Sequence, residues 1–259
     1  MVQCIEAPVR PLSAKVSGSS SVAPQKIHPA IAQLDLGQLN TQFEQATPQE
    51  ILAWAIEAIP NGLVQTTSFS MLAVTHMLYE ELNNTVPVIF LDTLHLFSET
   101  LDTARQAQTR YGLDLRTYRA KDVGTRQAFA KRYGEALWEI DIDRFYQVTK
   151  VEPLQRALKE LDVQAWITGR RRDQSPSRAN LPILERDEQG RLKINPLANW
   201  TRKDLWRYTF KHDVSYNPLH DQGYTSIGDE PLTTPTAANE DERAGRWRGS
   251  QKTECGIHL

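Results

Sequence analysis

The stretch VPVIFLD, residues 86–92, decides the fold class that we expect for this chain. Its β-branched and aromatic residues form a short apolar run, which is typical of a strand in the centre of a sheet. Apolar residues recur at helical spacing on either side of it, over 70–82 and over 97–112, where Gly112 ends the pattern. A strand flanked by two helices predicts one unit of an α/β fold.

The same alternation extends outward in both directions. Further strands are predicted at 63–68, 113–120 and 164–169, and further helices at 48–59, 151–162 and 201–213. Thr47 and Thr201 are the expected N-cap residues of two of these helices. The order predicts a mostly parallel, doubly wound sheet with helices on both faces. Because functional side chains in such sheets lie beyond the carboxyl ends of the strands, we expect the site near 66–70, 92–98 and 169–178.

Three segments of different composition divide the chain. Residues 1–30 are rich in Ser, Pro, Ala and Gln, and we expect a flexible N-terminal tail there. Residues 31–215 carry the α/β pattern and predict a single nucleotide-binding domain, which is long enough to bury a sizeable core. Residues 216–259 are rich in loops and predict a mobile C-terminal arm rather than a second core.

The composition argues against several classes of protein. A formal net charge of -2 gives no general affinity for nucleic acid. No apolar run approaches the roughly 18 residues that a membrane span needs. The two cysteines, Cys4 and Cys255, fit a reducing cytoplasm better than a disulfide framework, and they cannot supply a four-thiolate metal site. We therefore expect a cytoplasmic protein with no nucleic-acid or membrane partner and no metal centre.

Two of the expected strand ends carry groups that bind anions. TTSFS, residues 66–70, places hydroxyls and successive backbone amides before a helix, although an ordinary Ser/Thr N-cap explains the same residues. GRRRDQSPSR, residues 169–178, follows a strand and holds Arg170, Arg171, Arg172 and Arg178. Guanidinium groups match the oxygens of phosphate and sulfate. A solvated run of charge is the alternative there, and the position after a strand favours a polyanion site.

A third basic group lies close to the cysteine near the chain end. DERAGRWRG, residues 241–249, carries Arg243, Arg246 and Arg248. Nearby cations stabilise a thiolate, which is the reactive form of cysteine. Cys255, in the tail KTECGIHL, is therefore a candidate nucleophile rather than an incidental residue of a frayed terminus. His258 could assist it, although a histidine so near the end is more commonly just solvated.

Several stretches together carry a resemblance to a known family. They are VIFLDTLHLFSET (88–100), KVEPLQRALKEL (150–161), WITGRRRDQSPSRANLP (166–182), YNPLHDQGYTSIGD (216–229) and KTECGIHL (252–259). From about residue 60 to its end, the chain resembles the thioredoxin-dependent reductases of assimilatory sulfate reduction. These enzymes reduce an adenylyl sulfate to sulfite. The resemblance implies an adenine nucleotide alpha-hydrolase-like fold.

The resemblance also implies a role for each matching residue. Cys255 corresponds to the catalytic nucleophile. The implied substrate-binding residues are Thr66, Thr67, Ser68, Phe69, Ser70, Asp92, Thr93, Lys150, Arg171, Arg172, Arg178, Arg243, Arg246 and His258. Residues 66–70 would form the nucleotide loop, and residues 92–93 would lie beside the ribose and adenine. Lys150 and the arginines would bind the phosphate and phosphosulfate groups. Arg243 and Arg246, which belong to the C-terminal arm, would reach the phosphosulfate when the arm closes over it.

The family has a branch that takes adenosine 5'-phosphosulfate and carries a four-iron cluster. Two adjacent cysteines and a later C-x-x-C pair hold that cluster. In this chain the first place reads Phe145-Tyr146 and the second runs from Asp229 to Leu232. The missing thiols favour the cluster-free branch, which uses 3'-phosphoadenylyl sulfate, so we expect no cofactor. Two departures from the pattern are the ERAGRW segment, which is similar to the cluster branch, and Ser70, where the family usually has glycine.

The implied reaction has two steps. Cys255 attacks the sulfur of the bound phosphosulfate to give S-sulfocysteine and adenosine 3',5'-bisphosphate, and thioredoxin or glutaredoxin then releases sulfite. The resemblance also favours a homodimer. The alternatives are a cluster-free reductase of adenosine 5'-phosphosulfate, an ATP-pyrophosphatase-type adenylyl transferase and a non-catalytic nucleotide-binding module. The transferase is disfavoured because SFSMLA, residues 68–73, lacks the paired glycines and the Asp of the Ser-Gly-Gly-x-Asp-Ser loop.

Overall fold

The structure is a computed structural model that describes residues 27–250 and 252–258. Residues 1–26 of the predicted tail therefore lie outside the described residues. Helix α1 spans Pro29–Ala32, so the predicted boundary at residue 30 falls inside a helix. Ile31 is buried, and the amide of His28 donates to Oε1 of Gln164 at 2.8 Å. These contacts hold this part of the segment on the body of the protein.

Six strands form one sheet in the described part of the chain, in the order β3-β2-β1-β4-β6-β5. Their bounds are β1 Leu63–Thr67, β2 Val88–Leu91, β3 Leu115–Tyr118, β4 Ala165–Ile167, β5 Leu184–Arg186 and β6 Leu192–Ile194. Every neighbouring pair is parallel except β5 and β6. In the register of the central strands, Thr66 lies opposite Ile89 and Val64 opposite Trp166. The prediction of a mostly parallel sheet is confirmed.

The antiparallel pair β5 and β6 has no counterpart among the predicted strands. Each strand is three residues long, and the charged sequence around them gives little strand signal. Helix α2 (Leu36–Phe43) supplies the missing support, because the Asn40 side chain accepts from the Leu184 amide at 2.8 Å and donates to its carbonyl at 2.9 Å. Contacts from distant residues, rather than local propensity, therefore define this edge of the sheet.

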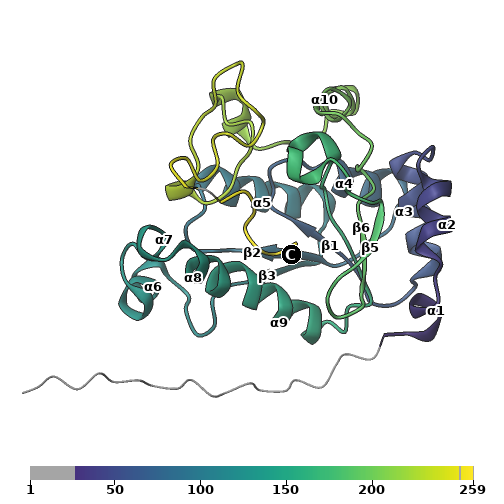
Figure 1. The fold of residues 1–259 in the computed structure, drawn as a ribbon, viewed down its shortest axis with the longest axis horizontal. Coiled ribbons are helices and arrows are strands. Elements are labelled where there is room, and N and C mark those ends of the chain that lie inside the picture. The colour runs from purple at the N-terminus through teal and green to yellow at the C-terminus, as the bar shows by residue number, and fades with distance from the viewer. Residues whose placement is uncertain (1–26, 251, 259) are drawn as a thin grey trace, which may run out of the picture.

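Helices cover both faces of the sheet, as predicted (Figure 1). One face carries α3 (Pro48–Ala58), α4 (Ala73–His76), α5 (Ser98–Tyr111) and α10 (Arg202–Lys211), which enclose the main core. On the other face, α9 (Glu152–Glu160) contributes Leu154 and Leu158 to a second core with Trp166. A third cluster, rich in aromatic residues, joins α6 (Arg126–Tyr133), α7 (Leu137–Ile140) and α8 (Ile142–Tyr146) to Trp247.

Local signals place the helix ends closely in three cases. Thr47 and Thr201 each form a capping box at the start of a helix, and Gly112 ends α5 in the left-handed conformation with φ 63°. The segment predicted as a helix over 70–82 differs, because α4 begins at Ala73 and continues as a π turn over Met77–Glu81. A second π turn, Gln147–Val151, connects α8 to α9 and carries Lys150.

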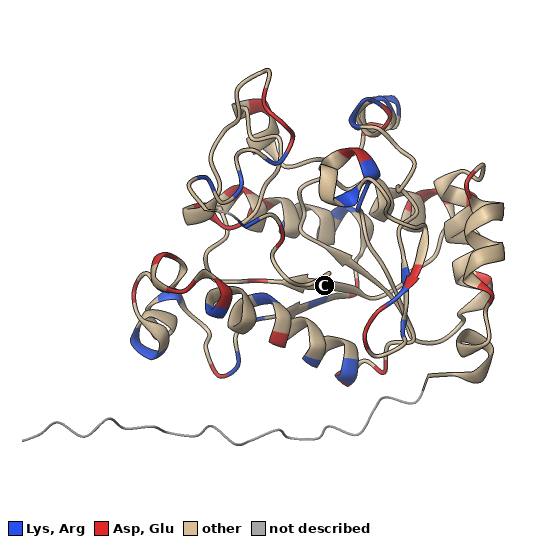
Figure 2. Ribbon diagram, viewed as in Figure 1, with Lys and Arg blue, Asp and Glu red and all other residues tan. Residues whose placement is uncertain are grey.

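The C-terminal arm begins at residue 216, and the helical structure within its described residues, 216–250 and 252–258, consists of the short 3-10 turns Pro218–Gln222 and Glu230–Leu232. Isolated bridges join Met71 to Tyr216 and Leu96 to Asp229, so the arm packs on the loops that follow β1 and β2. The end of the arm returns over the middle of the sheet (Figure 1). Basic and acidic residues are interspersed over both layers (Figure 2). None of the helices in the described residues is long and apolar enough to cross a membrane.

Candidate active site

The pocket lies where the order of the strands reverses. Strand β1 has β2 on one side and β4 on the other, so the strands that follow β1 in the chain continue on opposite sides of it. Such a switch point leaves a crevice beyond the carboxyl ends of the strands. Thr66, Leu91 and Gly169 line the pocket from the three strand ends, and the C-terminal arm closes it from the other side. The sheet topology therefore places a pocket beside the strand ends at which we expect the site.

The loop after β1 brings four of its five predicted residues to the pocket. Thr66, Thr67, Ser68 and Ser70 line it. The Ser70 hydroxyl lies 3.0 Å from Nε2 of His220 on the arm. Phe69 is the exception, because its φ of 51° turns the ring into the core against Phe90, with the centroids 4.9 Å apart. The ring of Phe69 therefore lies in the core, which leaves the backbone of this residue for the predicted contact of the loop with a nucleotide.

The end of β2 also differs from its prediction, because neither Asp92 nor Thr93 lines the pocket. Asp92 accepts from Nε of Arg119 at 2.8 Å. Thr93 donates to Oδ1 of Asp229 at 2.7 Å. Both side chains are buried in these contacts, and Leu91 is the β2 residue at the pocket wall. Leu91 thus brings this strand end to the pocket, whereas the predicted polar side chains bind protein groups.

The arginines that follow β4 differ in their position relative to the pocket. Arg170 and Arg171 line the pocket; Arg170 pairs with Glu185, and Arg171 donates to Glu242 of the arm at 2.6 Å. Arg172 turns away, donating to the Leu181 carbonyl at 2.7 Å and to Glu44 on the outer surface. The predicted phosphate-binding role of Arg172 is therefore wrong, because Glu44 and the Leu181 carbonyl hold its guanidinium outside the pocket.

Arg178 binds the residue that precedes the candidate nucleophile. Its Nε and Nη2 atoms each donate to a carboxylate oxygen of Glu254 at 2.7 Å. Arg243 donates to the same carboxylate at 3.1 Å. Burial, and next the charge of Arg178, lower the pKa of Arg243 to about 10. Two guanidinium groups thus hold one carboxylate in the pocket, an arrangement that also suits a phosphate or sulfate group.

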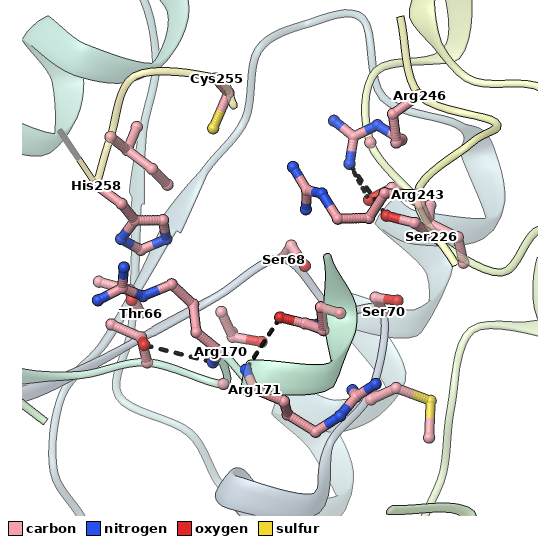
Figure 3. A pocket seen from close by; sticks show the side chains of 18 of the residues that line it. Thr66, Ser68, Ser70, Arg170, Arg171, Ser226, Arg243, Arg246, Cys255 and His258 are labelled. Carbon is pink, nitrogen blue, oxygen red and sulfur yellow. Dashed lines mark hydrogen bonds between the residues drawn. The ribbon is translucent and has the colours of Figure 1, made fainter. Parts of the chain in front are cut away.

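The two arginines of the arm share one aromatic platform. The guanidinium carbons of Arg243 and Arg246 lie 5.1 Å and 4.5 Å from the centroid of the Trp247 ring. The indole of Trp247 donates to the Tyr146 hydroxyl at 2.6 Å, which fixes the ring on helix α8. Gly228 permits the approach of Arg246, because a Cβ at this position would lie 2.1 Å from Nη2. The platform directs both cations toward the pocket (Figure 3).

Lys150 provides a further cation at the pocket wall. Its Nζ donates to Oδ2 of Asp229 at 2.6 Å and lies 4.7 Å from the centroid of the Tyr146 ring. Burial by itself lowers the pKa of Lys150, but the charges of Asp229 and Tyr146 outweigh it and raise that pKa above its ordinary value. The lysine is therefore a stable cation in this site.

Cys255 lies in the same pocket, with its sulfur directed into the open space (Figure 3). The side chain is partly exposed. His258 is partly buried, with its Nδ1 atom enclosed, and its ring stacks on Trp166 with the centroids 5.6 Å apart and the planes 7° from parallel. Burial, and next the charge of Arg170, hold the pKa of His258 well below its ordinary value. His258 is therefore not the solvated terminal histidine that is the more common case.

The structure brings together residues that are far apart in the sequence. The predicted site residues that line the pocket are Thr66, Thr67, Ser68, Ser70, Lys150, Arg171, Arg178, Arg243, Arg246, Cys255 and His258. The pocket also contains residues without a predicted role, among them Gln65, Met71, Arg170, Arg202, Trp206 and His220. Arg170 belongs to the arginine run and could have been included. Trp206 and His220 carry no local signal, because the fold alone brings α10 and the arm to the pocket.

Hydroxyls, guanidinium groups and a thiol thus line one crevice of an α/β fold, and this set of groups suits an anionic small molecule. The sequence profile of the Phosphoadenosine phosphosulfate reductase domain matches residues 62–235. The chain therefore belongs to the phosphoadenosine phosphosulfate reductase family, which is a family of oxidoreductases. The resemblance found in the sequence is confirmed.

Relatives of two names are similar to this chain. Phosphoadenosine phosphosulfate reductase of Emericella nidulans is 46% identical over 85% of this chain and 74% of its own length. Adenosine 5'-phosphosulfate reductase of Salinibacter ruber is 44% identical over 86% of this chain and 88% of its own length. The crystal structure of phosphoadenylyl-sulfate reductase from Candida auris, a phosphate complex, has a TM-score of 0.71 at 40% identity. It matches 77% of this chain and 96% of that one.

The positions that would hold an iron-sulfur cluster in one branch do not fit such a group here. Phe145, Tyr146 and Leu232 pack in the aromatic cluster with Trp247, and Asp229 is bound to Lys150. None of these four side chains offers a thiolate, which is the ligand that these clusters require. In the described residues, no group of three or more His, Cys, Asp or Glu side chains could hold a metal ion.

Proposed function

We propose that this chain reduces 3'-phosphoadenylyl sulfate to sulfite and adenosine 3',5'-bisphosphate in assimilatory sulfate reduction, with thioredoxin or glutaredoxin as the reductant. The observation that supports this most is the position of Cys255 in one pocket with Lys150, Arg178 and Arg243. A substrate with several negative charges repels a thiolate until cations neutralise it. This pocket gathers the cations around the sulfur in a chain whose net charge is slightly negative.

In the first step the Cys255 thiolate attacks the sulfur of the phosphosulfate. A bond forms between the two sulfur atoms, and the bond from the sulfuryl group to the bridging oxygen breaks. That oxygen keeps the electron pair and leaves with adenosine 3',5'-bisphosphate, so Cys255 becomes S-sulfocysteine. This is covalent catalysis by a thiolate. Lys150 and Arg246 would stabilise the negative charge that develops on the leaving phosphate.

In the second step a thiolate of the reductant attacks Sγ of Cys255 and forms a mixed disulfide. Sulfite leaves with the electron pair of the broken sulfur–sulfur bond. The second thiol of the reductant then releases the Cys255 thiolate, and the reductant is left as a disulfide. Two electrons are thus transferred from the dithiol to the sulfur that leaves as sulfite. The partial exposure of Cys255, and the absence of a side chain at Gly256, suit the approach of a second protein.

The 3'-phosphorylated nucleotide is the substrate that the charges favour. Besides Lys150, Arg243 and Arg246, the pocket is lined by Arg170, Arg171, Arg178 and Arg202. Such a number of cations suits a substrate that carries a phosphate in addition to its phosphosulfate. The positions without thiols also point to the cluster-free branch. Adenosine 5'-phosphosulfate is the second candidate, because relatives with that name are nearly as similar to this chain.

Mass spectrometry of the Cys255 peptide tests the proposal directly. The protein is incubated with 3'-phosphoadenylyl sulfate or with adenosine 5'-phosphosulfate, without a reductant. We expect a sulfonate adduct on Cys255 with the first nucleotide and its loss, with release of sulfite, when thioredoxin is added. Cys4→Ser, which removes the chain's other cysteine, should behave as wild type, whereas Cys255→Ser should bind adenosine 3',5'-bisphosphate without turnover. Turnover by Cys255→Ser contradicts the mechanism, and faster reaction with the second nucleotide contradicts the choice of substrate.

A further inference from the structure

A fully buried carboxylate lies behind the wall of the pocket. Asp229 is 0% exposed, and it is not itself among the lining residues. Its Oδ2 accepts from Nζ of Lys150 at 2.6 Å, and its Oδ1 accepts from Oγ1 of Thr93 at 2.7 Å. The three partners come from different parts of the chain: the arm, the π turn before α9 and the loop after β2. The carboxylate therefore fixes the lysine from behind, on the side away from the pocket.

The lysine needs such a partner in order to stay charged. A buried ammonium without a counter-ion loses its proton readily, because burial disfavours the charged form. The groups that act on Lys150 are the carboxylate of Asp229, the ring and hydroxyl of Tyr146, the thiol of Cys255 and the guanidinium of Arg246. Arg246 opposes the charge of the lysine, and Asp229 gives the strongest support to it.

Asp229 itself is surrounded by groups that keep it ionised. Besides Lys150 and Thr93, the guanidinium of Arg246 lowers its pKa, which lies below the ordinary value although burial acts in the opposite direction. His95 also faces it, and burial holds the pKa of that histidine below its ordinary value. The pair is thus a buried ammonium and a buried carboxylate joined by a charge-assisted hydrogen bond, and removal of one partner from such a pair has a large effect.

We propose that Asp229 is a positioning residue of this site, whose carboxylate holds the charged ammonium of Lys150 at the pocket wall beside Cys255. The inference rests on the proposed function, because the lysine acts there on the phosphosulfate. Asp229 touches neither the substrate nor the thiol and works through Lys150 alone. It follows that the residue affects the sulfonation step and not merely the packing of the arm.

The pH dependence of Cys255 sulfonation separates these two roles. The single-turnover rate of adduct formation, without reductant, is measured in wild type and in Asp229→Asn, which keeps the shape of the side chain. We expect the alkaline limb of the profile to move to lower pH by about one unit or more, because Lys150 loses its proton earlier. A profile that falls uniformly at every pH, without a shift, overturns the proposal.

A double-mutant cycle with Lys150→Met gives a second readout. If Asp229 acts through Lys150, then Asp229→Asn slows sulfonation in the wild-type background and has no further effect in Lys150→Met. In Lys150→Met the Asp229 carboxylate keeps Thr93 and Arg246 as partners, and the double variant contains no unpaired buried charge. The comparison of these two variants therefore remains decisive if Asp229→Asn alone folds poorly. A further loss of rate in the double variant overturns the proposal.

Asp187→Asn is the matched control. Asp187 forms a buried ion pair with Arg191, with 2.6 Å between Oδ2 and Nε, and neither residue lines the pocket. This variant should lower the stability without a shift in the pH profile. Failure of the proposed function would appear as the absence of a Cys255 adduct in wild type. Failure of the present inference would appear as an unshifted profile in a wild-type background that does form the adduct.

Discussion

The two halves of the pocket are held in place by different forces. On the sheet side, backbone hydrogen bonds fix the strands, such as that from the Gln65 amide to the Pro87 carbonyl at 2.9 Å and that from the Thr168 amide to the Ile194 carbonyl at 2.9 Å. On the arm side, regular structure is limited to short turns, and side-chain ion pairs provide many of the contacts. Examples are Arg178–Glu254, Arg171–Glu242 and Lys150–Asp229.

This difference separates the sheet side of the pocket, which keeps its position, from the arm side, which we expect to move. Backbone hydrogen bonds in a sheet cannot be replaced by a small ligand. A carboxylate held by guanidinium groups can be replaced by the phosphate or sulfate of a ligand, because the same donors fit both. The arm can therefore exchange the ion pairs of Glu242 and Glu254, which line the pocket, for contacts with a substrate, while the sheet and the buried Lys150–Asp229 pair keep their geometry. Mobility of the arm remains a prediction, and the following variants test its physical basis.

The largest expected effect concerns the sheet. Trp166 is 1% exposed in the centre of β4, and Trp166→Ala should lower the free energy of unfolding by about 3–5 kcal/mol through lost burial and a cavity. His258→Ala removes the ring of the arm that stacks on the same indole, and should cost less than about 1 kcal/mol of global stability. Urea unfolding measures both values. Equal losses would show that the arm unfolds with the core.

Arg178 and Arg172 give the next largest contrast. Arg178→Ala should weaken the binding of adenosine 3',5'-bisphosphate by about 10–100-fold, because charge-assisted hydrogen bonds contribute roughly 1.5–3 kcal/mol. Arg172→Ala should leave that affinity unchanged, since its guanidinium faces Glu44 outside the pocket. Isothermal calorimetry measures both. Comparable losses in the two variants would mean that the position relative to the pocket does not decide the role.

For Glu254 we expect a substitution to strengthen ligand binding rather than to weaken it. If a ligand must replace this carboxylate on Arg178 and Arg243, Glu254→Gln should bind adenosine 3',5'-bisphosphate more tightly, by about 3–10-fold. Glu240→Gln is the control. Because Glu240 pairs with Arg248 at the surface, this variant should bind adenosine 3',5'-bisphosphate with wild-type affinity. Weaker binding by Glu254→Gln would show that the carboxylate helps to build the site instead.

The smallest expected effect is a dependence on pH of the stability with which the tail, residues 252–258, is docked. The ring of His258 is largely removed from solvent in the docked tail, and its pKa there lies well below its ordinary value of 6.5. The stabilisation of the docked tail is therefore complete above about pH 6.5 and decreases as the pH falls below that value, because the released histidine takes up a proton. Hydrogen exchange of residues 252–258, corrected for its intrinsic rate, should rise on acidification. In His258→Gln this dependence should disappear.

Much of the fold could be predicted because its signals are local. The apolar run at 86–92, the capping threonines and Gly112 each act within a few residues, and all of them lie where the sequence places them. The hairpin of β5 and β6 could not be found, because Asn40 and the neighbouring helix stabilise strands that have little propensity of their own. The same limit applies to the helix predicted over 70–82, which starts later and ends in a π turn.

For the site, the sequence by itself determined which kinds of groups are present: hydroxyls after β1, arginines after β4, Lys150, and Cys255 in the tail. It also determined the family, because these groups occur in recognisable motifs. Only the tertiary structure decided which of them face the pocket. Neighbours such as Arg171 and Arg172 differ in direction rather than in chemistry, and Asp229 gains its place beside Lys150 from chain segments that meet only after folding.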